Sequence, residues 1–204
     1  MRRIVVAITG ATGAIFGVRV LEALGAAGVE THLVLSTWGQ KTVEHETGLT
    51  FDELRQRAAV VHGTGNMAAT VSSGSFRTEG MIVAPCSMRT AAAIALGHGE
   101  NLVHRAADVV LKERRKLVLV PRETPLSEVH LENLLKLARM GVAIVPPMPA
   151  FYNKPASIDD LVNHIVARVL DQFDIDARFA KRWDGRLARA AHPAKQPAKN
   201  GDTP

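Results

Sequence analysis

Short, wholly apolar runs alternate along this chain with longer amphipathic segments, and this alternation restricts the fold more than any other feature. Residues 4–8 (IVVAI), 80–85 (GMIVAP) and 116–120 (KLVLV) hold a single charged side chain among them. Strands that are apolar on both faces form parallel sheets with helices on each side. The pattern therefore predicts an α/β protein with a doubly wound parallel sheet and helices on both faces, in three αβα layers. The other predicted strands cover residues 31–36, 60–62 and 142–145.

Helices are expected between the predicted strands. Residues 13–26 carry an apolar stripe, and residues 127–140 repeat leucine at helical spacing. The last helix is expected to begin at Ser157, a favourable N-cap residue with Asp160 three positions on, and to run to about residue 173. Further helices are predicted over residues 38–47, 51–57, 88–96 and 106–115, and residues 66–78 are predicted to form a loop.

Length and charge point to one compact domain, residues 1–184, followed by a basic tail, residues 185–204. The net charge is +5, but the tail holds four Lys and Arg against one Asp and is rich in alanine and proline. We therefore expect a disordered tail and a body too weakly charged for nucleic acid. No apolar run reaches the ~18 residues of a membrane span. Cys86 is the only cysteine, which predicts a cytoplasmic protein.

A glycine-rich turn follows the first predicted strand, where residues 10–17 read GATGAIFG. Backbone N–H groups and the helix dipole at such a turn favour an anion. The spacing departs from the G-x-G-x-x-G of dinucleotide sites, and the second strand ends at Ser36 rather than at an acidic residue. The turn therefore predicts a smaller ligand with one phosphate. The alternative is that the glycines only let the helix pack on the strand.

Polar residues also gather where other predicted strands end, at Ser36, at residues 86–90 (CSMRT) and at residues 121–123 (PRE). Ligands of open α/β sheets bind beyond the carboxyl ends of the strands. These hydroxyls and this cation therefore predict a ligand site at that edge. Ser87 and Thr90 are equally compatible with capping the helix that follows them.

Several stretches carry a family resemblance: GATGAIFG, SSGSFRT, APCSMRT, VPRETPLSEVHLENLLKL, PPMPAFYNKP and VARVLDQF. Over nearly all of residues 3–184 the chain resembles the UbiX family of flavin prenyltransferases, most of all the Pad-type branch that is paired with phenolic-acid and hydroxybenzoate decarboxylases. The resemblance implies a flavodoxin-like (Rossmann-like) fold and a flavoprotein domain that transfers a dimethylallyl group from dimethylallyl phosphate to N5 and C6 of reduced FMN. The product, prenylated FMN, would serve a separate UbiD-type decarboxylase. A homo-oligomer is also implied, because relatives are typically dodecamers with active sites built across subunit contacts.

The resemblance also implies roles for individual residues. Thr12 keeps the hydroxyl of a serine found in many relatives, whereas Met67 stands in a stretch where many of them have tryptophan. Catalytic roles are implied for Glu46, Lys112, Arg122, Glu123, Tyr152 and Arg168, of which Lys112, Tyr152 and Arg168 would also bind dimethylallyl phosphate. Contacts with FMN are implied for Gly10, Ala11, Thr12, Ser36, Ser87, Met88, Arg89, Thr90 and Arg122.

Prenyl transfer needs side chains of these types. Cations stabilise the charge that grows on a leaving phosphate, and a guanidinium binds phosphate through two parallel hydrogen bonds. A carboxylate such as Glu46 or Glu123, or the released phosphate, could take the proton lost from C6. Trp38, Met67 and Tyr152 could form apolar or π walls around an allylic cation. No metal is expected, because the protein supplies the cations and its eight histidines show no ligand spacing.

Simpler interpretations of the same residues stay open. Lys112 lies in the charged run KERRK and Arg168 on the polar side of a helix, positions typical of solvated side chains. Cys86 fits a small core residue better than a nucleophile. Two other functions are also compatible with the sequence: an FMN-dependent decarboxylase that acts directly on an aromatic acid, and an FMN carrier subunit.

Overall fold

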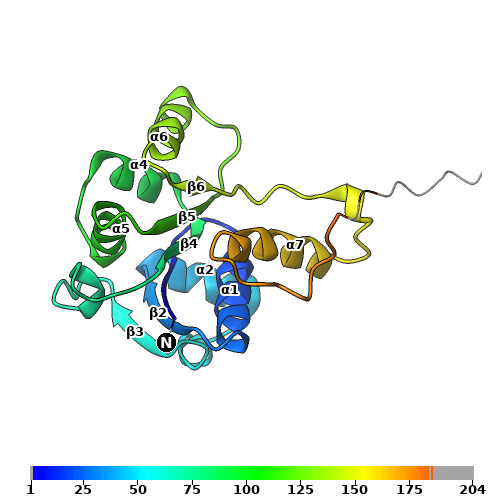
Figure 1. The fold of residues 1–204 in the computed structure, drawn as a ribbon, viewed down its shortest axis with the longest axis horizontal. Coiled ribbons are helices and arrows are strands. Elements are labelled where there is room, and N and C mark those ends of the chain that lie inside the picture. The colour runs from blue at the N-terminus through cyan, green and yellow to red at the C-terminus, as the bar shows by residue number, and fades with distance from the viewer. Residues whose placement is uncertain (1, 184, 186–204) are drawn as a thin grey trace, which may run out of the picture.

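The fold is built on a six-stranded sheet in which every strand is parallel to its neighbours (Figure 1). The computed structural model describes residues 2–183 and 185. The strand order β3-β2-β1-β4-β5-β6 is that of the Rossmann-type doubly wound sheet, so the predicted fold class is confirmed. The strands are β1 (Arg3–Ile8), β2 (Glu30–Leu35), β3 (Val60–Gly63), β4 (Gly80–Cys86), β5 (Lys116–Pro121) and β6 (Ala143–Ile144).

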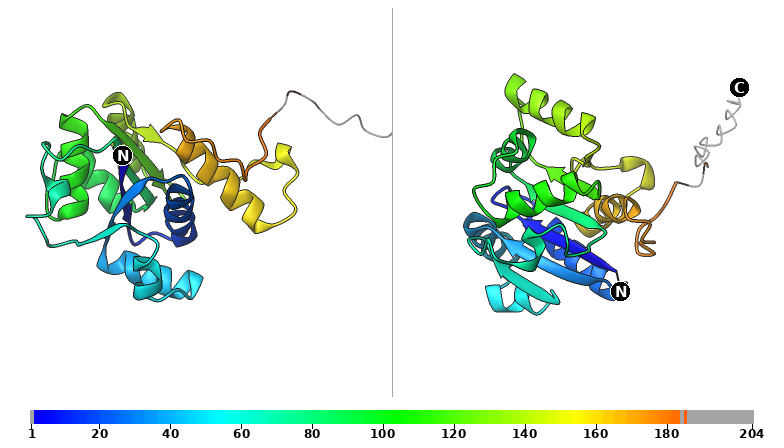
Figure 2. Two further views of the ribbon diagram at one scale, coloured as in Figure 1. Left: turned by 60° about the horizontal axis from the view of Figure 1, so that its bottom comes forward. Right: turned by 60° about the vertical axis from the view of Figure 1, so that its left-hand side comes forward.

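Helices cover both faces of the sheet, which gives the predicted three layers (Figure 2). They are α1 (Ala14–Ala26), α2 (Thr37–Thr47), α3 (Phe51–Arg55), α4 (Met88–Leu96), α5 (Leu102–Lys112), α6 (Glu128–Arg139) and α7 (Ile158–Asp171), with the short 3-10 helices η1 (Thr70–Ser72) and η2 (Phe151–Asn153). α1 and α7 pack against each other on one face, where α2 and α3 also contribute to the core. α4, α5 and α6 pack on the other face.

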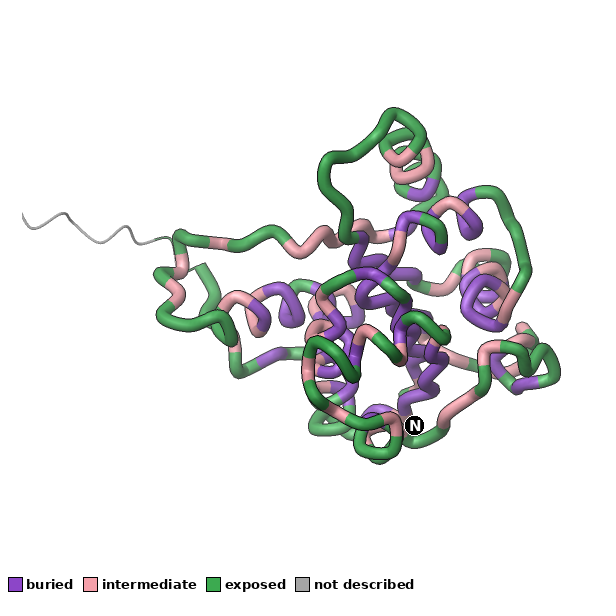
Figure 3. Tube along the Cα trace, turned by 180° about the vertical axis from the view of Figure 1, so that it is seen from behind, coloured by how far each residue is buried: buried purple, intermediate pink, exposed green. Residues whose placement is uncertain are grey.

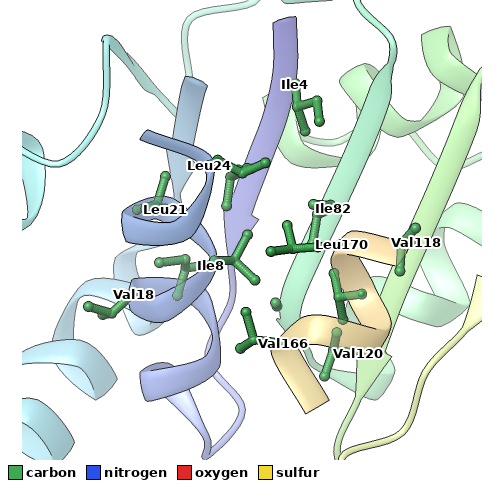
Figure 4. Close-up of a cluster of buried hydrophobic side chains, with 14 of the residues drawn as sticks. Ile4, Ile8, Val18, Leu21, Leu24, Ile82, Val118, Val120, Val166 and Leu170 are labelled. Atoms are coloured by element: carbon green, nitrogen blue, oxygen red, sulfur yellow. The ribbon is translucent and has the colours of Figure 1, made fainter. Parts of the chain in front are cut away.

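The central strands contribute side chains to two separate hydrophobic cores, one on each face of the sheet, which explains why their sequences are apolar without alternation. Ile4 and Ile8 of β1 point into the core beneath α1 and α7, whereas Val5 and Ala7 point into the core beneath α4 and α5. All four side chains are buried. Figure 4 shows the first core, formed by Ile4, Ile8, Val18, Leu21, Leu24, Ile82, Val118, Val120, Val166 and Leu170 among others.

Side-chain caps fix where the helices begin. Ser157 accepts a hydrogen bond from the backbone N–H of Asp160, as the sequence predicts. The helix predicted over residues 106–115 instead begins at Leu102, because Asn101 accepts a hydrogen bond from the backbone N–H of His104 and starts the helix a turn earlier. This earlier start moves His104 into the first turn of α5.

Gly17 lets α1 lie directly against the sheet. A Cβ atom at this position would stand 2.2 Å from the carbonyl oxygen of Ala84 and 2.7 Å from a side-chain carbon of Ile8. The packing alternative for the glycine-rich stretch is therefore correct for Gly17. It does not exclude a ligand role for the glycines earlier in the turn.

The chain beyond β6 forms an arm, residues 145–157, that projects from the body before α7 returns to α1 (Figure 1). Met148 and Phe151 on the arm are each 70% exposed. On α6, Leu131 and Leu135 are also exposed and only Leu137 is buried, so one chain covers little of the predicted leucine stripe (Figure 3). The arm and α6 therefore offer apolar surface that a second molecule could bury.

Across residues 2–183, no helix combines the length and the apolar character required to cross a bilayer. The same part of the chain contains no cluster of three His, Cys, Asp or Glu side chains placed to hold a metal ion. The predicted tail, residues 185–204, lies outside the described residues except for Gly185.

Candidate active site

A cavity opens at the carboxyl edge of the sheet, where β1 and β4 are neighbours. This is the point at which the order of strands reverses, the usual ligand position in a doubly wound sheet. Its lining includes five of the residues predicted to contact FMN: Gly10, Ser36, Ser87, Arg89 and Thr90. The full lining of this carboxyl-edge cavity is Thr9, Gly10, Ser36, Thr37, Trp38, Thr64, Gly65, Ser87, Arg89, Thr90, Asn101 and His104.

Thr9 ties the end of β1 to the turn between β4 and α4. Its hydroxyl donates to the carbonyl oxygen of Pro85 at 2.9 Å and accepts from the backbone N–H of Ser87 at 2.8 Å. The side chain is buried, so these bonds exchange little with water. The floor of the cavity is therefore held in one geometry before any ligand arrives.

Two of the predicted FMN-binding hydroxyls also cap helices. Ser36 accepts from the backbone N–H of Gly39 at 2.9 Å, and Ser87 accepts from that of Thr90 at 3.3 Å. The capping alternative for Ser87 is therefore correct. A hydroxyl that accepts one bond still has its own proton to donate. In Ser36 that proton is available to a ligand oxygen in the cavity.

The glycine-rich turn binds a carboxylate of the protein itself, that of Glu46. One carboxylate oxygen of Glu46 accepts hydrogen bonds from the backbone N–H groups of Gly13 (2.9 Å) and Ala14 (2.8 Å), at the start of α1. The amide of Ala11 is also used, since it donates to the carbonyl oxygen of Thr9. A ligand phosphate at this turn would therefore depend on the amide and hydroxyl of Thr12 and on nearby groups such as Ser36.

His104 brings a buried imidazole to the cavity. Its side chain lines the cavity from the first turn of α5, yet the residue is only 4% exposed. Burial lowers the pKa of His104 below its ordinary value, so the ring is neutral near pH 7. Among the sealed side-chain nitrogens and oxygens of the described residues, only Nδ1 of His104 has no hydrogen-bond partner.

The other predicted FMN contacts lie outside the cavity lining. Ala11 and Met88 are buried, and the Met88 side chain packs in the core beneath α4 and α5. Met88 can therefore reach a ligand only through its backbone, and its contact with FMN stays a prediction. Arg122 and Glu123 follow β5 at the carboxyl edge with exposed side chains, and the backbone N–H of Arg122 donates to the carbonyl oxygen of Cys86.

Tyr152 and Arg168 meet in a second cavity, formed where α7 passes the arm. Asn153 donates from Nδ2 to Nδ1 of His164 at 2.9 Å, which places the histidine proton on Nε2. That nitrogen lies 3.5 Å from the hydroxyl oxygen of Tyr152, so the tyrosine can keep its own proton for a ligand. The lining of this arm cavity is Tyr152, His164, Ala167, Arg168, Asp171, Ala180, Lys181, Arg182 and Trp183.

Positive charge exceeds negative charge in the arm cavity. Three cations, Arg168, Lys181 and Arg182, share it with the single carboxylate of Asp171. Arg168 and Arg182 each bind Asp171 at 2.7 Å. The hydrogen bond from Arg182 holds the pKa of Asp171 below its usual range. The cavity therefore suits a small anion such as a phosphate.

Lys112 lies at the opposite edge of the sheet from the carboxyl-edge cavity. It is the last residue of α5, and β5 begins four residues later at its amino end. Along the helix it stands about 12 Å from His104, at 1.5 Å per residue. Its ammonium group binds Glu113. Lys112 therefore lines neither the carboxyl-edge cavity nor the cavity that holds Tyr152 and Arg168, and its implied role at the prenyl phosphate stays a prediction.

Cys86 is a core residue. Its side chain is fully buried at the end of β4, and burial raises the pKa of its thiol to about 12. A thiol in this state supplies almost no thiolate near neutral pH. The nucleophile alternative for Cys86 therefore has no support in the structure.

The chain's relatives fit this arrangement. The family model described as Flavoprotein matches residues 1–170. A probable UbiX-like flavin prenyltransferase of Streptomyces sp. (strain D7) is 64% identical over 191 residues, which cover 93% of this chain and 96% of the relative. The chain belongs to the UbiX-like flavin prenyltransferase family.

Solved structures of UbiX-like proteins agree with the family assignment. AnUbiX (PadA1), crystallised with FMN and dimethylallyl pyrophosphate, is 56% identical with a TM-score of 0.90, over 91% of this chain and 99% of that one. A dodecameric FMN-dependent UbiX-like decarboxylase from Escherichia coli O157:H7 is 59% identical with a TM-score of 0.88, over 90% of this chain and 100% of that one.

The end of β3 and the start of α5 contribute cavity residues that the sequence prediction missed: Thr64, Gly65, Asn101 and His104. Thr64 and Gly65 follow the short strand β3, so the same strand-end rule applied there would have found them. Asn101 is recognisable as an N-cap residue. His104 carries no signal of its own in the sequence, because its place in the site depends on where α5 begins.

Proposed function

We propose that this protein transfers a dimethylallyl group from dimethylallyl phosphate to reduced FMN, and that the prenylated FMN serves a separate UbiD-type aromatic-acid decarboxylase. The observation that supports this most is a carboxyl-edge cavity, at the switch point of the sheet, in a chain 56% identical to a UbiX protein crystallised with FMN and a dimethylallyl donor. We also place the protein in the cytoplasm, because its one cysteine cannot form an intrachain disulfide.

FMN is proposed to occupy the carboxyl-edge cavity. The Ser36 hydroxyl, the Arg89 guanidinium and the unpartnered His104 ring supply a donor set that fits a phosphate and a polar flavin. The Ser87 and Thr90 hydroxyls bond each other at 3.0 Å, so together they add one further proton. When bound, reduced FMN supplies the nucleophile. No metal is included in the proposal, because the protein's own cations can neutralise the prenyl phosphate.

The prenyl phosphate is proposed to sit against the arm cavity. Arg168 can bind two phosphate oxygens, and the Tyr152 hydroxyl can donate its proton to a third. Both contacts strengthen as negative charge moves onto the leaving phosphate. The proton lost from C6 has three candidate acceptors. These are the Glu46 carboxylate, which two backbone amides hold at the turn, the exposed Glu123 carboxylate at the carboxyl edge, and the released phosphate.

A second copy of the chain is proposed to bring Lys112 to this phosphate. Within one chain Lys112 lies about 12 Å along α5 from the carboxyl edge, and it lines neither cavity. The E. coli relative is dodecameric, and the arm and α6 of this chain leave apolar surface for subunit contacts. We therefore propose a homo-oligomer, a dodecamer like that relative, with composite active sites.

The direct assay is anaerobic incubation of the protein with reduced FMN and dimethylallyl phosphate, followed by mass spectrometry of the flavin. The proposal predicts a flavin heavier by one C5 prenyl unit. A parallel reaction with dimethylallyl pyrophosphate identifies the donor. FMN that binds but stays unmodified with both donors would favour the carrier alternative, and carbon dioxide released from an aromatic acid by this chain alone would favour the decarboxylase alternative.

Three variants test the assigned residues in the same assay. Glu46→Gln should still bind FMN but form the adduct more slowly, with Glu44→Gln on the same helix as the control. Unchanged turnover in Glu46→Gln would remove this carboxylate from the mechanism.

Lys112→Ala and Arg168→Ala should each be impaired alone. Co-expressed in one oligomer, they should recover part of the activity, because some composite sites then receive both native side chains. No recovery in verified mixed oligomers would contradict the composite site.

A further inference from the structure

The His104 imidazole has a buried nitrogen atom, Nδ1, for which the fold supplies no hydrogen-bond partner. Buried polar atoms almost always have a hydrogen-bond partner, and one left without a partner destabilises the folded protein. Nδ1 of His104 is the only such side-chain atom within residues 2–183. The cavity that His104 lines is otherwise well bonded, with capped serines and the doubly bonded Thr9.

The position of the histidine proton follows from the geometry. A sealed N–H without an acceptor is rarer and costlier than a sealed acceptor without a donor, so Nδ1 carries the lone pair and the proton lies on Nε2. Nε2 is not sealed, and it has no hydrogen bond within the described part of the chain. Since His104 lines the cavity, Nε2 is the nitrogen that reaches it.

We infer that His104 is a ligand-positioning residue that donates a hydrogen bond from Nε2 to an acceptor atom of the flavin nucleotide. This inference rests on the proposed binding of FMN in the carboxyl-edge cavity. Burial lowers the pKa of His104, which agrees with a neutral donor in this place. A protonated ring would place a sealed N–H without an acceptor at Nδ1, so the neutral form is also the one that the surrounding protein accommodates.

Asn101 and Thr64 show why this ring stays in place without a partner. Asn101 accepts the backbone N–H of His104 at 3.1 Å, and the backbone N–H of Leu102 donates to the carbonyl oxygen of Thr64 at 2.8 Å. The start of α5 is thereby fixed to the end of β3, and His104 with it. The ring is held toward the cavity by its backbone and by packing rather than by a bond of its own.

Three substitutions at His104 separate a ligand role from a structural one. Glutamine places its amide nitrogen near the position of Nε2, asparagine places it near Nδ1, and leucine fills a similar volume without a donor. The dissociation constant for FMN, measured by quenching of flavin fluorescence, should rise about tenfold in His104→Leu and His104→Asn, the size of one hydrogen bond in a closed site. His104→Gln should stay within about threefold of the native protein by the same reasoning.

The melting temperature of the FMN-free protein is the second readout. A structural histidine would lower it when replaced, whereas His104→Leu should equal or exceed the native value because the unpartnered atom is gone. His45→Leu, on the exposed surface of α2, is the control for FMN affinity. Native affinity in His104→Leu, or equal losses in the Gln and Leu variants, would overturn the inference. Native protein that binds no FMN would instead refute the proposed function.

Discussion

The hydrogen bonds between Glu46 and the start of α1 should contribute measurably to the stability of the fold. α1 begins after Gly13, which has no side chain to cap the helix, and Glu46 of α2 supplies the missing acceptor from another element. Both bonds go to the same oxygen atom. Glutamine retains one such oxygen and loses only the charge, whereas alanine loses the acceptor entirely.

The two changes should therefore differ in size. Losing a capping acceptor costs about 1 kcal/mol, and losing the charge at a helix N-terminus costs about 0.5 kcal/mol at an exposed site. Glu46→Ala should lower the free energy of unfolding by about 1.5 kcal/mol and Glu46→Gln by about 0.5 kcal/mol. For a chain of this length, these values correspond to decreases in melting temperature of about 3–6 °C and about 1–2 °C.

The assay is thermal unfolding of FMN-free protein followed by far-UV circular dichroism, at one protein concentration so that oligomer dissociation is held constant. Glu44→Ala is the matched control, because Glu44 is exposed on the same helix and, among residues 2–183, its carboxylate bonds only the Gln40 side chain. It should melt within about 1 °C of the native protein. A Glu46→Ala variant that melts with the control would refute the capping role.

Three further predictions concern the body of the fold. Gly17→Ala should keep α1 from packing closely on the sheet and lower the free energy of unfolding by more than about 3 kcal/mol. A Cβ atom at Gly25 meets no atom within 4 Å, so Gly25→Ala should raise the free energy of unfolding by about 0.5 kcal/mol. Chemical denaturation measures both changes. Cys86 should resist iodoacetamide at pH 8 until the protein is unfolded, as mass spectrometry of the labelled protein would show, since its thiol pKa is about 12. The hydrogen bond from Arg182 is the main cause that lowers the pKa of Asp171 in the folded state. The ion pair therefore stabilises the fold fully above the unfolded pKa of about 3.9, and this stabilisation is lost as the pH falls below that value. Limited pepsin digestion between pH 4 and pH 2 should accordingly cleave near residues 175–183 first; cleavage independent of pH over that window would contradict it.

Much of the fold follows from sequence because local and global signals agree. The apolar run of β1 has no polar residue on either face, and such a strand fits only the middle of a covered parallel sheet. Ser157 and Asp160 form the cap that their spacing predicts. The predicted start of α5 lies a turn too late, because Asn101 follows a polar segment in which a cap and a loop residue look alike.

The site was predictable only in part, for a physical reason. Residues that follow strands share the carboxyl edge, so Gly10, Ser36 and Ser87 could be grouped without coordinates. Lys112 could not be placed in this way, because it ends a helix at the other edge of the sheet. The occupation of the turn amides by Glu46 was also hidden, since that contact spans 32 residues and depends on how α2 turns back toward α1.

In the proposed oligomer, the carboxyl-edge cavity binds FMN while the arm cavity of one chain and Lys112 of another hold the prenyl phosphate. A crystal structure of the oligomer grown with FMN and dimethylallyl phosphate would show both ligands at once. We expect flavin density between Ser36, Ser87 and His104, with the phosphate touching Tyr152 and Arg168 of one chain and Lys112 of a neighbour. An empty carboxyl-edge cavity, or a phosphate that no Lys112 approaches, would contradict it.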